Sequence, residues 1–341
     1  MAEYVGFDVS MEETAVCVMD GDGRISWRGK CLSTPERMAG TLRAHAPQAE
    51  RIVFETGALS TWHWHKLHDM GFPVVCVDAR RAKKALSMYS AKTDRIDAEG
   101  LAQLARTGWY TEVQVKGVDK HRLRSALIVR AKLVGVQRDL GTQMRGILKT
   151  FGLIVGKASG KKFARRVREL ASGEDIVSTL IDALLTAWET IGAQIARVEK
   201  ELRHRMSRDS ICRLLMSAPG VGFITALAYV TVIDDPHRFR HSASVGVYLG
   251  LTPRRYQSGE MDYSGHISHC GDALLRSYLF EAANVLLTRV RRGCLPKTWA
   301  ATLAKKVGTK KAKVALARKL AVILHRMWID NASFCWTAQK P

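Results

Sequence analysis

Short apolar runs alternate with segments of helical spacing over the first 115 residues. Residues 4–9 and 13–19 are rich in strand-forming side chains, and a third such run, 25–30, follows a Gly-Asp-Gly turn at 21–23. Because so short a turn joins neighbouring antiparallel strands, the pattern predicts a three-stranded meander at the start of the chain.

Helices and strands are expected to alternate after this meander. The run 51–55 is short and apolar, as expected of a buried strand, and residues 73–77 form a similar run. Apolar positions at helical spacing fill the segments 35–44, 62–70 and 94–107. This order predicts an α/β domain with a mixed sheet, in the order of the ribonuclease-H-like fold.

The middle of the chain has helical spacing throughout. From Ile181 to Leu202 apolar residues recur at alternating spacings of three and four, which is a heptad pattern. Leu133 to Phe151 has similar spacing. We expect a coiled coil that joins two protomers. The pattern leaves an intramolecular helical hairpin open as the alternative.

The last third is expected to be mainly helical, with helices at 272–292 and 311–328. Pro-Gly-Val-Gly at 219–222 lies between helical patterns and is typical of a helix-hairpin-helix motif. There Gly220 and Gly222 would let the backbone approach closely and leave a helix N-terminus open to a phosphate. A tight turn between core helices would use the same residues.

The length of 341 residues allows more than one domain. These patterns predict an α/β domain at 1–115, a helical coiled-coil or linker region at 116–210, and a mainly helical domain at 211–341. The fold class is therefore α/β plus all-α.

The charge of the chain is strongly positive and uneven. The sequence has 53 Lys and Arg against 32 Asp and Glu, a formal net charge of +21. Residues 1–115 carry 14 basic and 15 acidic side chains, so the whole excess lies in residues 116–341. Such an asymmetry indicates a surface for a polyanion, with nucleic acid as the first choice. An anionic membrane surface and simple solubility are the weaker alternatives.

Cysteine usage and hydropathy exclude other classes. The seven cysteines are scattered without a Cys-x-x-Cys pair, which favours reduced thiols over a disulfide framework or a zinc ribbon. The sequence shows neither a signal peptide nor an apolar run of the roughly 20 residues that a membrane span needs. We therefore expect a cytoplasmic protein without a membrane partner.

Four carboxylates are candidates for a metal site. Asp8 lies in the first predicted strand, Glu55 ends another, and Asp94 and Asp97 share one face at a helix start. If they converge, they repel each other by several kcal/mol unless cations neutralise them. Oxygen ligands suit Mg²⁺, and a pair of such ions is a common device for phosphodiester chemistry. Taken alone, Asp94 could be only a helix N-cap.

Residues 249–259, Leu-Gly-Leu-Thr-Pro-Arg-Arg-Tyr-Gln-Ser-Gly, form a second dense cluster. A serine with two arginines close by can be a nucleophile whose developing charge the guanidinium groups stabilise. The serine is Ser258, and the arginines are Arg254 and Arg255. No histidine is adjacent to supply a base, so chemistry alone favours a turn residue.

Five motifs occur in one order along nearly the whole chain: GFDVS at 6–10, FETG at 54–57, KTDRIDA at 92–98, PGVG at 219–222 and GLTPRRYQSG at 250–259. In this the chain resembles the DEDD transposases of the insertion-sequence-110 family, which are related to the Piv-type DNA invertases. The resemblance implies a RuvC-like N-terminal domain, a coiled-coil middle and a C-terminal transposase domain.

By position, the resemblance assigns the acidic tetrad to Asp8, Glu55, Asp94 and Asp97 and the nucleophilic serine to Ser258. It thereby reverses the interpretation of Ser258 as a turn residue. It also implies two Mg²⁺ ions per site, target and donor DNA, a structured bridge RNA as guide, and a homodimer or homotetramer that acts on bacterial nucleoid DNA.

The function expected from this resemblance is a transposase and DNA recombinase that cleaves and rejoins strands through a phosphoserine intermediate. Its basic C-terminal segment would hold nucleic-acid backbone, with Lys310, Lys311 and Lys313 as candidates. A RuvC-like Mg²⁺-dependent hydrolytic junction nuclease is the enzymatic alternative. An architectural nucleic-acid-binding protein is the alternative without catalysis.

Overall fold

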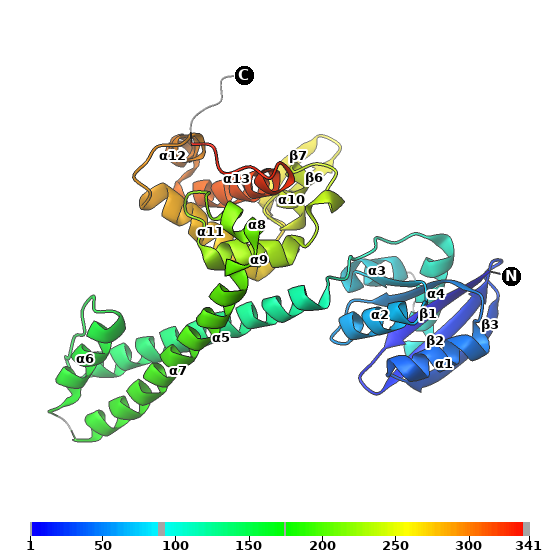
Figure 1. The fold of residues 1–341 in the computed structure, drawn as a ribbon, viewed down its shortest axis with the longest axis horizontal. Helices are drawn as coiled ribbons and strands as arrows, with labels where there is room; N and C mark the ends of the chain where they lie inside the picture. Colours follow the sequence, from blue (N-terminus) through cyan, green and yellow to red (C-terminus); the bar gives the residue numbers. More distant parts are fainter. Residues whose placement is uncertain (1, 88–92, 174, 337–341) are drawn as a thin grey trace. The chain divides into compact units, whose positions relative to one another are not determined.

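The structure is a computed structural model that describes residues 2–87, 93–173 and 175–336, with the side chain of residue 175 left out. The chain divides into two compact units, Met1–Lys116 and Gly117–Pro341 (Figure 1). Each unit has its own hydrophobic core. The boundary expected at residue 210 stays a prediction.

The first unit is built on a five-stranded mixed sheet with the strand order β3-β2-β1-β4-β5. Strands β1, β2 and β3 form the antiparallel meander, and β4 and β5 join it in parallel on the other side of β1. The strands are β1 (Glu3–Val9), β2 (Glu13–Asp20), β3 (Ile25–Leu32), β4 (Ala49–Glu55) and β5 (Val74–Val77). The predicted meander and the mixed sheet are confirmed.

Helices cover both faces of this sheet. Met38 of α1 (Pro35–His45) and Leu67 of α2 (Ser60–Asp69) pack on one face against Phe7. Leu101 of α4 (Asp94–Thr107) packs on the other face, together with α3 (Ala79–Leu86). The predicted helices are confirmed, and α3 is an additional helix that the sequence analysis missed.

Two long helices form the arm of the second unit, α5 (Val118–Thr150) and α7 (Asp175–Ser207), with the short α6 (Gly160–Ala171) beside them (Figure 1). The two run antiparallel: Arg130 forms an ion pair of 2.7 Å with Glu199, and the Gln137 amide donates to the carbonyl of Trp188 at 3.2 Å.

The two ends of the heptad side of α7 are buried within the chain. Ile181 is fully buried in a cluster with Met144 of α5 and Phe163 of α6, and Leu202 is buried in the C-terminal core. The intramolecular hairpin thus accounts for the buried heptad positions, whereas Ile191 and Ile195 are only half-buried. A coiled coil that joins two protomers stays a prediction.

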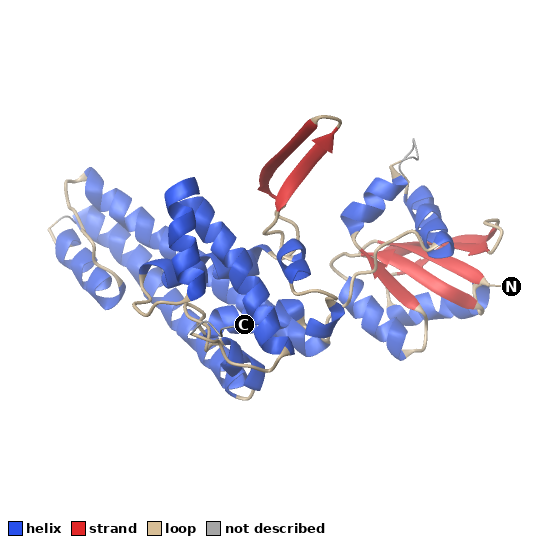
Figure 2. Cartoon of the chain, turned by 90° about the horizontal axis from the view of Figure 1, so that it is seen from above, coloured by secondary structure: helices blue, strands red, loops and turns tan. Residues whose placement is uncertain are grey.

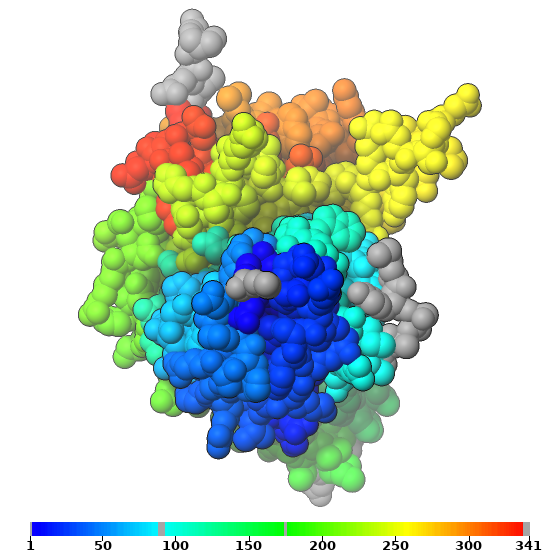
Figure 3. Space-filling model, turned by 90° about the vertical axis from the view of Figure 1, so that its right-hand side faces the viewer, coloured from blue at the N-terminus to red at the C-terminus, as the bar shows by residue number. Residues whose placement is uncertain are grey.

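The C-terminal part of the second unit is a helical cluster from which one β-hairpin projects (Figures 2 and 3). The hairpin consists of β6 (Pro253–Ser258) and β7 (Met261–Ile267). The helices are α8 (Ser210–Leu215), α9 (Phe223–Ile233), the 3₁₀ helix η1 (Pro236–Arg238), α10 (Ala243–Tyr248), α11 (Ala273–Thr288), α12 (Leu295–Val307) and α13 (Thr309–Ile329).

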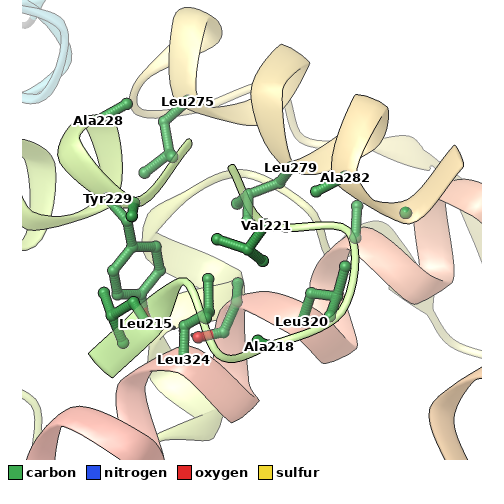
Figure 4. Close-up of a cluster of buried hydrophobic side chains, with 14 of the residues drawn as sticks. Leu215, Ala218, Val221, Ala228, Tyr229, Leu275, Leu279, Ala282, Leu320 and Leu324 are labelled. Atoms are coloured by element: carbon green, nitrogen blue, oxygen red, sulfur yellow. Dashed lines mark hydrogen bonds between the residues drawn. The ribbon is translucent and has the colours of Figure 1, made fainter. Parts of the chain in front are cut away.

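Apolar side chains from four of these helices meet in one core. Tyr229 of the largely apolar α9 lies among Leu215, Leu279 and Leu324, which come from α8, α11 and α13 (Figure 4). The Tyr229 hydroxyl donates to the carbonyl of Ala321 at 2.7 Å, which satisfies a buried polar group. Leu251 and Ile267, at the base of the hairpin, pack on the same core.

Two expectations for this region were incomplete. The sequence analysis predicted no strand there and missed α12. The helix that it predicted at 272–292 is α11, which ends earlier, at Thr288. Strands β6 and β7 are almost wholly exposed, so their side chains lack the apolar alternation that identifies a half-buried strand.

One helix of the described residues, Ile176–Ser207, is long and apolar enough to cross a membrane by length and composition alone. The expectation that no such stretch exists was therefore too strict. The apolar side of this helix packs on α5 and α6, and a single helix of this kind is weak evidence for a membrane span.

Candidate functional site

Asp8 and Glu55 lie at the same end of two adjacent parallel strands. Phe7 of β1 is paired with Phe54 of β4, and the two carboxylates are the next residue on each strand. Both side chains are half-buried, and both line one cavity of about 260 Å³. The carboxyl ends of parallel strands are where α/β folds commonly place a site.

Both carboxylates point to the sheet face that α4 covers. Gly6 and Val53 face α4, because a Cβ at Gly6 would overlap the backbone of Ala98 and because Val53 packs on Leu101. Side chains two residues apart on a strand share a face. Asp8 and Glu55 therefore project to this face as well.

Asp94 and Asp97 are in the first turn of α4, at the same end of the sheet. The opposite end of α4 is fixed near the start of β1, since the Arg106 guanidinium donates to the carbonyl of Gly21 at 3.2 Å. Asp94, Asp97 and Leu101 share one helix stripe, and Leu101 is buried against the sheet. The four predicted residues thus gather at one end and one face.

Asp94 is not the N-cap of α4. The N-cap is Thr93, whose hydroxyl accepts a hydrogen bond from the amide of Ile96 at 3.3 Å. Lys92, the first residue of the predicted KTDRIDA motif, lies outside the described residues. The N-cap interpretation of Asp94 is therefore wrong, and its remaining structural role is that of an acidic residue in the first turn of the helix.

The donor chemistry of this site fits a hard divalent cation, because carboxylate oxygens are the ligands that Mg²⁺ prefers. Among the described residues, however, no group of three or more Asp, Glu, His or Cys is arranged to hold an ion. The structure brings Asp8 and Glu55 to one cavity and leaves both Asp94, which is exposed, and Asp97, which is half-buried, outside its lining. That the tetrad forms a metal site remains a prediction.

A cysteine on the strand next to Glu55 belongs to the core. Cys76 lies on β5 opposite Phe54 and is buried with it on the sheet face that α1 and α2 cover. Burial raises the pKa of its thiol to about 12, and the charges of Glu112 and Glu55 add to the rise. The sequence analysis did not single out Ser10 and Ser60, which line the cavity beside the two carboxylates.

Ser258 lies at the tip of the β-hairpin, in the second compact unit. It ends β6, pairs with Met261, and precedes Gly259, whose φ of +55° makes the tight turn. The Ser258 side chain is exposed. The sequence analysis predicted no strand around Ser258, and the structure places it in the two-stranded hairpin of β6 and β7.

The two arginines of the motif have different surroundings. Arg255 faces away from Ser258, because residues three apart on a regular strand point to opposite faces. It forms a bidentate ion pair with Asp262, at 2.8 and 2.5 Å, and this hydrogen bonding lowers the pKa of Asp262. Arg254 lies where the register of the pairing between β6 and β7 shifts, and its guanidinium group donates to the carbonyl of Ser268 at 3.1 Å.

Close backbone contacts fix the base of the hairpin. A Cβ at Gly250 would overlap the backbone of Cys270, and one at Gly271 would overlap the carbonyl of Tyr248. Both glycines have positive φ angles, of +65° and +69°. Gly250 of the motif and Gly271 beyond it therefore seat the hairpin on the helices.

The Pro-Gly-Val-Gly turn joins α8 to α9. Gly220 has a φ of +84°, and a Cβ there would overlap the carbonyl of Ala282 on α11, so its role is helix packing. Gly222 is exposed, caps α9 and has open space around it. Gly220 thus fits the tight-turn alternative, while phosphate binding at Gly222 stays a prediction.

The predicted lysines all lie on α13. Lys310 and Lys311 are exposed and line a large groove between α13 and the base of the hairpin. Lys313 is half-buried and is not among the residues that line this groove. Their contact with nucleic acid stays a prediction.

Comparison with known proteins identifies the class as a DNA transposase. Residues 5–152 match the family model of the DEDD transposases of the IS110 type, and residues 212–299 match the transposase IS116/IS110/IS902 family. A DEDD transposase domain implies a RuvC-like fold, with which the mixed sheet agrees.

Curated relatives extend the similarity over nearly the whole chain. The transposase for insertion sequence element IS1111A of Coxiella burnetii is 29% identical, over 94% of this chain and 88% of the relative. A probable family 20 transposase of Pseudomonas aeruginosa is 29% identical, over 78% of this chain and 80% of the relative. The chain is accordingly assigned to the insertion-sequence transposases of the IS110 type, and the expected family is confirmed at this level.

Proposed function

We propose that this transposase cuts and rejoins DNA through a phosphoserine intermediate formed on Ser258. The observation that carries the proposal is the presentation of Ser258 at an exposed hairpin tip that glycine contacts seat on a rigid core. The similarity to insertion-sequence transposases supports DNA as the substrate.

In the proposed step the Ser258 oxygen forms a bond to phosphorus while the bond from phosphorus to one sugar oxygen breaks. The serine hydroxyl loses a proton, and the released sugar hydroxyl gains one. Because one phosphoester replaces another, the bond energy is kept for rejoining by the reverse reaction. Arg254, on the strand of the serine, is the guanidinium group proposed to stabilise the charge that develops on the phosphate.

The carboxylates would hold the divalent metal. Asp8, Glu55 and Asp97 are the half-buried donors of the set, and Asp94 is the exposed one that completes it. When bound, Mg²⁺ supplies electrostatic stabilisation of the phosphodiester under attack. The protein residues themselves contribute a preformed end of a sheet where negative charge is concentrated, which favours cation binding.

The remaining partners follow from the charge and the resemblance. The excess of basic residues after position 115 supports binding of a polyanion, with Lys310, Lys311 and Lys313 proposed to contact nucleic-acid backbone. A structured bridge RNA that pairs with target and donor DNA, and assembly as a homodimer or homotetramer, complete the proposal.

The end chemistry of cleaved DNA tests this function against the hydrolytic alternative. DNA with a labelled strand is incubated with the protein and Mg²⁺, and both new ends are analysed. Serine attack predicts one end that is blocked until protease treatment. Two free ends, a phosphate and a hydroxyl, would assign the reaction to a RuvC-like hydrolytic nuclease. No cleavage by an intact, DNA-binding protein would favour the architectural alternative.

A further inference from the structure

A large groove lies in the second unit between the base of the hairpin and α13. Its volume is about 990 Å³. Pro253 and Ile267, which pair with each other at the base of the hairpin, form one wall. Val314 and Lys310 of α13 form the other, and Trp299 of α12 closes one side.

The floor of the groove is apolar and aromatic. Leu251, Val314 and Val322 contribute aliphatic surface. The residue Trp299 is 39% exposed, and the ammonium group of Lys319 lies 4.4 Å from the centre of its ring. An exposed indole held by a cation–π contact is a ready surface on which a second flat group can stack.

The rim of the groove is positive. Lys310, Lys311, Arg318 and Lys319 line it, and no Asp or Glu is among the described lining residues. A positive rim over an apolar, aromatic floor fits a ligand with an anionic part and a flat part. A nucleotide has both, whereas a lipid tail has no flat group to match the indole and an apolar peptide segment has no anionic group to match the rim.

We propose that this groove binds one unpaired nucleotide of the DNA strand near the phosphodiester that Ser258 attacks. Its base stacks on Trp299, and its phosphate lies against Lys310 and Lys311. A paired base inside a duplex cannot present its flat face to a side chain, so the nucleotide must leave the stack. The volume is that of a small-molecule site, which suits a single nucleotide.

The hairpin sets the spacing between groove and nucleophile. Pro253 lines the groove, and Ser258 is five residues further along the same strand. At about 3.3 Å per residue this is roughly 17 Å. One DNA strand advances about 3.4 Å per nucleotide along the helix axis, so the bound base is expected about five nucleotides or fewer from the attacked phosphate.

This inference rests on DNA being the substrate, but it does not require the serine chemistry. Binding is therefore measured with Ser258→Ala protein, which leaves the DNA uncut. Fluorescence anisotropy gives the dissociation constant for a labelled single-stranded DNA oligonucleotide. Base stacking on an aromatic ring contributes enough that Trp299→Ala should weaken binding about tenfold. Trp299→Phe, which keeps a flat ring, should restore most of the affinity.

Oligonucleotides with one abasic residue separate stacking from a general loss of binding. An abasic residue in place of the nucleotide that stacks on Trp299 should weaken binding to the protein that retains Trp299 about tenfold, as Trp299→Ala does. The same oligonucleotide should show no further loss of affinity for the Trp299→Ala protein. Trp62→Ala removes a comparably exposed tryptophan from the first unit and should change nothing. Thermal unfolding of each variant verifies the fold.

Two results would overturn the proposal. Equal DNA affinity of the Trp299 and Trp299→Ala proteins would show that the indole holds no base. A loss confined to an RNA oligonucleotide of the same sequence would assign the groove to RNA instead of the DNA strand. Neither result affects the test of phosphoserine formation, so failure of this inference and failure of the proposed function remain distinguishable.

Discussion

Gly6 of β1 and Ala98 of α4 pack backbone against backbone, with no room for a side chain between them. Asp8 is two residues beyond Gly6 on the strand, and Asp97 is the residue before Ala98 on the helix. This contact therefore determines how the two pairs of the acidic tetrad are placed relative to each other. It explains why a glycine precedes the first aspartate.

Replacement of Gly6 by alanine should destabilise the protein and reduce activity together. The added Cβ would overlap backbone atoms, which cannot rotate away, so α4 must shift; overpacking of this kind costs about 1–3 kcal/mol. The matched control is Gly40→Ala on α1, where a Cβ meets nothing within 4 Å. The control should be neutral or more stable by up to about 1 kcal/mol. Urea unfolding of both variants measures the difference, and equal stabilities would contradict the argument.

Asp8→Asn and Asp97→Asn should abolish strand cleavage while DNA binding remains. Each change removes one negative charge from the proposed cation site and keeps the shape of the side chain, so the fold should be unaffected or more stable. Asp69→Asn, at an exposed position on α2, is the charge-matched control. Cleavage at the normal rate by either tetrad variant would remove these residues from the mechanism.

The salt dependence of DNA binding should change with the groove lysines. Each lost phosphate contact lowers the slope of log affinity against log salt by roughly 0.7–0.9. Lys310→Ala with Lys311→Ala should therefore flatten the slope by about one to two units. Lys313→Ala, at a half-buried position outside the groove lining, should have the smaller effect.

The control for this series is Lys161→Ala with Lys162→Ala on α6, which removes the same charge from exposed positions far along the arm. An affinity loss without a change in slope would mean that Lys310 and Lys311 act through folding.

Stability should fall as the pH drops below about 6.5, the usual pKa of histidine. Burial lowers the pKa of His63 and of His325, so both rings stay neutral in the folded chain while the unfolded chain takes up protons. The stability that the two histidines contribute is present above pH 6.5. It is lost as the pH falls from there through the lowered pKa values that the two rings have in the folded chain.

His63→Gln should reduce this acid sensitivity, because glutamine can donate to the carbonyl of Ser33 as the ring does at 3.0 Å and does not titrate. The melting temperature of the full chain at pH 7.5 and 5.5 measures the effect, with exposed His204→Gln as the control. If His63→Gln leaves the difference between the melting temperatures at pH 7.5 and 5.5 unchanged, protonation of His63 is not linked to unfolding.

The sequence predicted the first unit more fully than the second. Buried strands such as Arg51 to Glu55 are short apolar runs between turns, so their pattern and their carboxylates are visible in the sequence. The pairing of Phe7 with Phe54 then brings Asp8 and Glu55 together as a consequence of the sheet order. The tilt of α4 that places Asp94 depends on close packing at Gly6, which no periodicity shows.

The hairpin and the groove were not predictable in the same way. Strand β6 has six exposed residues, so its pairing with β7 leaves no apolar alternation. The base-stacking role proposed for Trp299 depends on its contact with Lys319 of the next helix and on the nearby base of the hairpin. Both are 20 or more residues away in sequence. The heptad of α7 was visible, but its partner could not be identified, because an apolar seam is the same whether α5 or a second chain covers it.

The most direct test of the central claim is the capture of a covalent protein–DNA adduct. The protein is incubated with Mg²⁺ and DNA carrying the element's ends, the reaction is stopped in detergent, and the attached residue is mapped by mass spectrometry. The account predicts a phosphodiester link to Ser258 that is lost in Ser258→Ala and retained in Ser264→Ala, a serine on the neighbouring strand of the same hairpin. Cleavage by the Ser258→Ala protein at the normal rate, with no adduct from the unaltered chain, would contradict it.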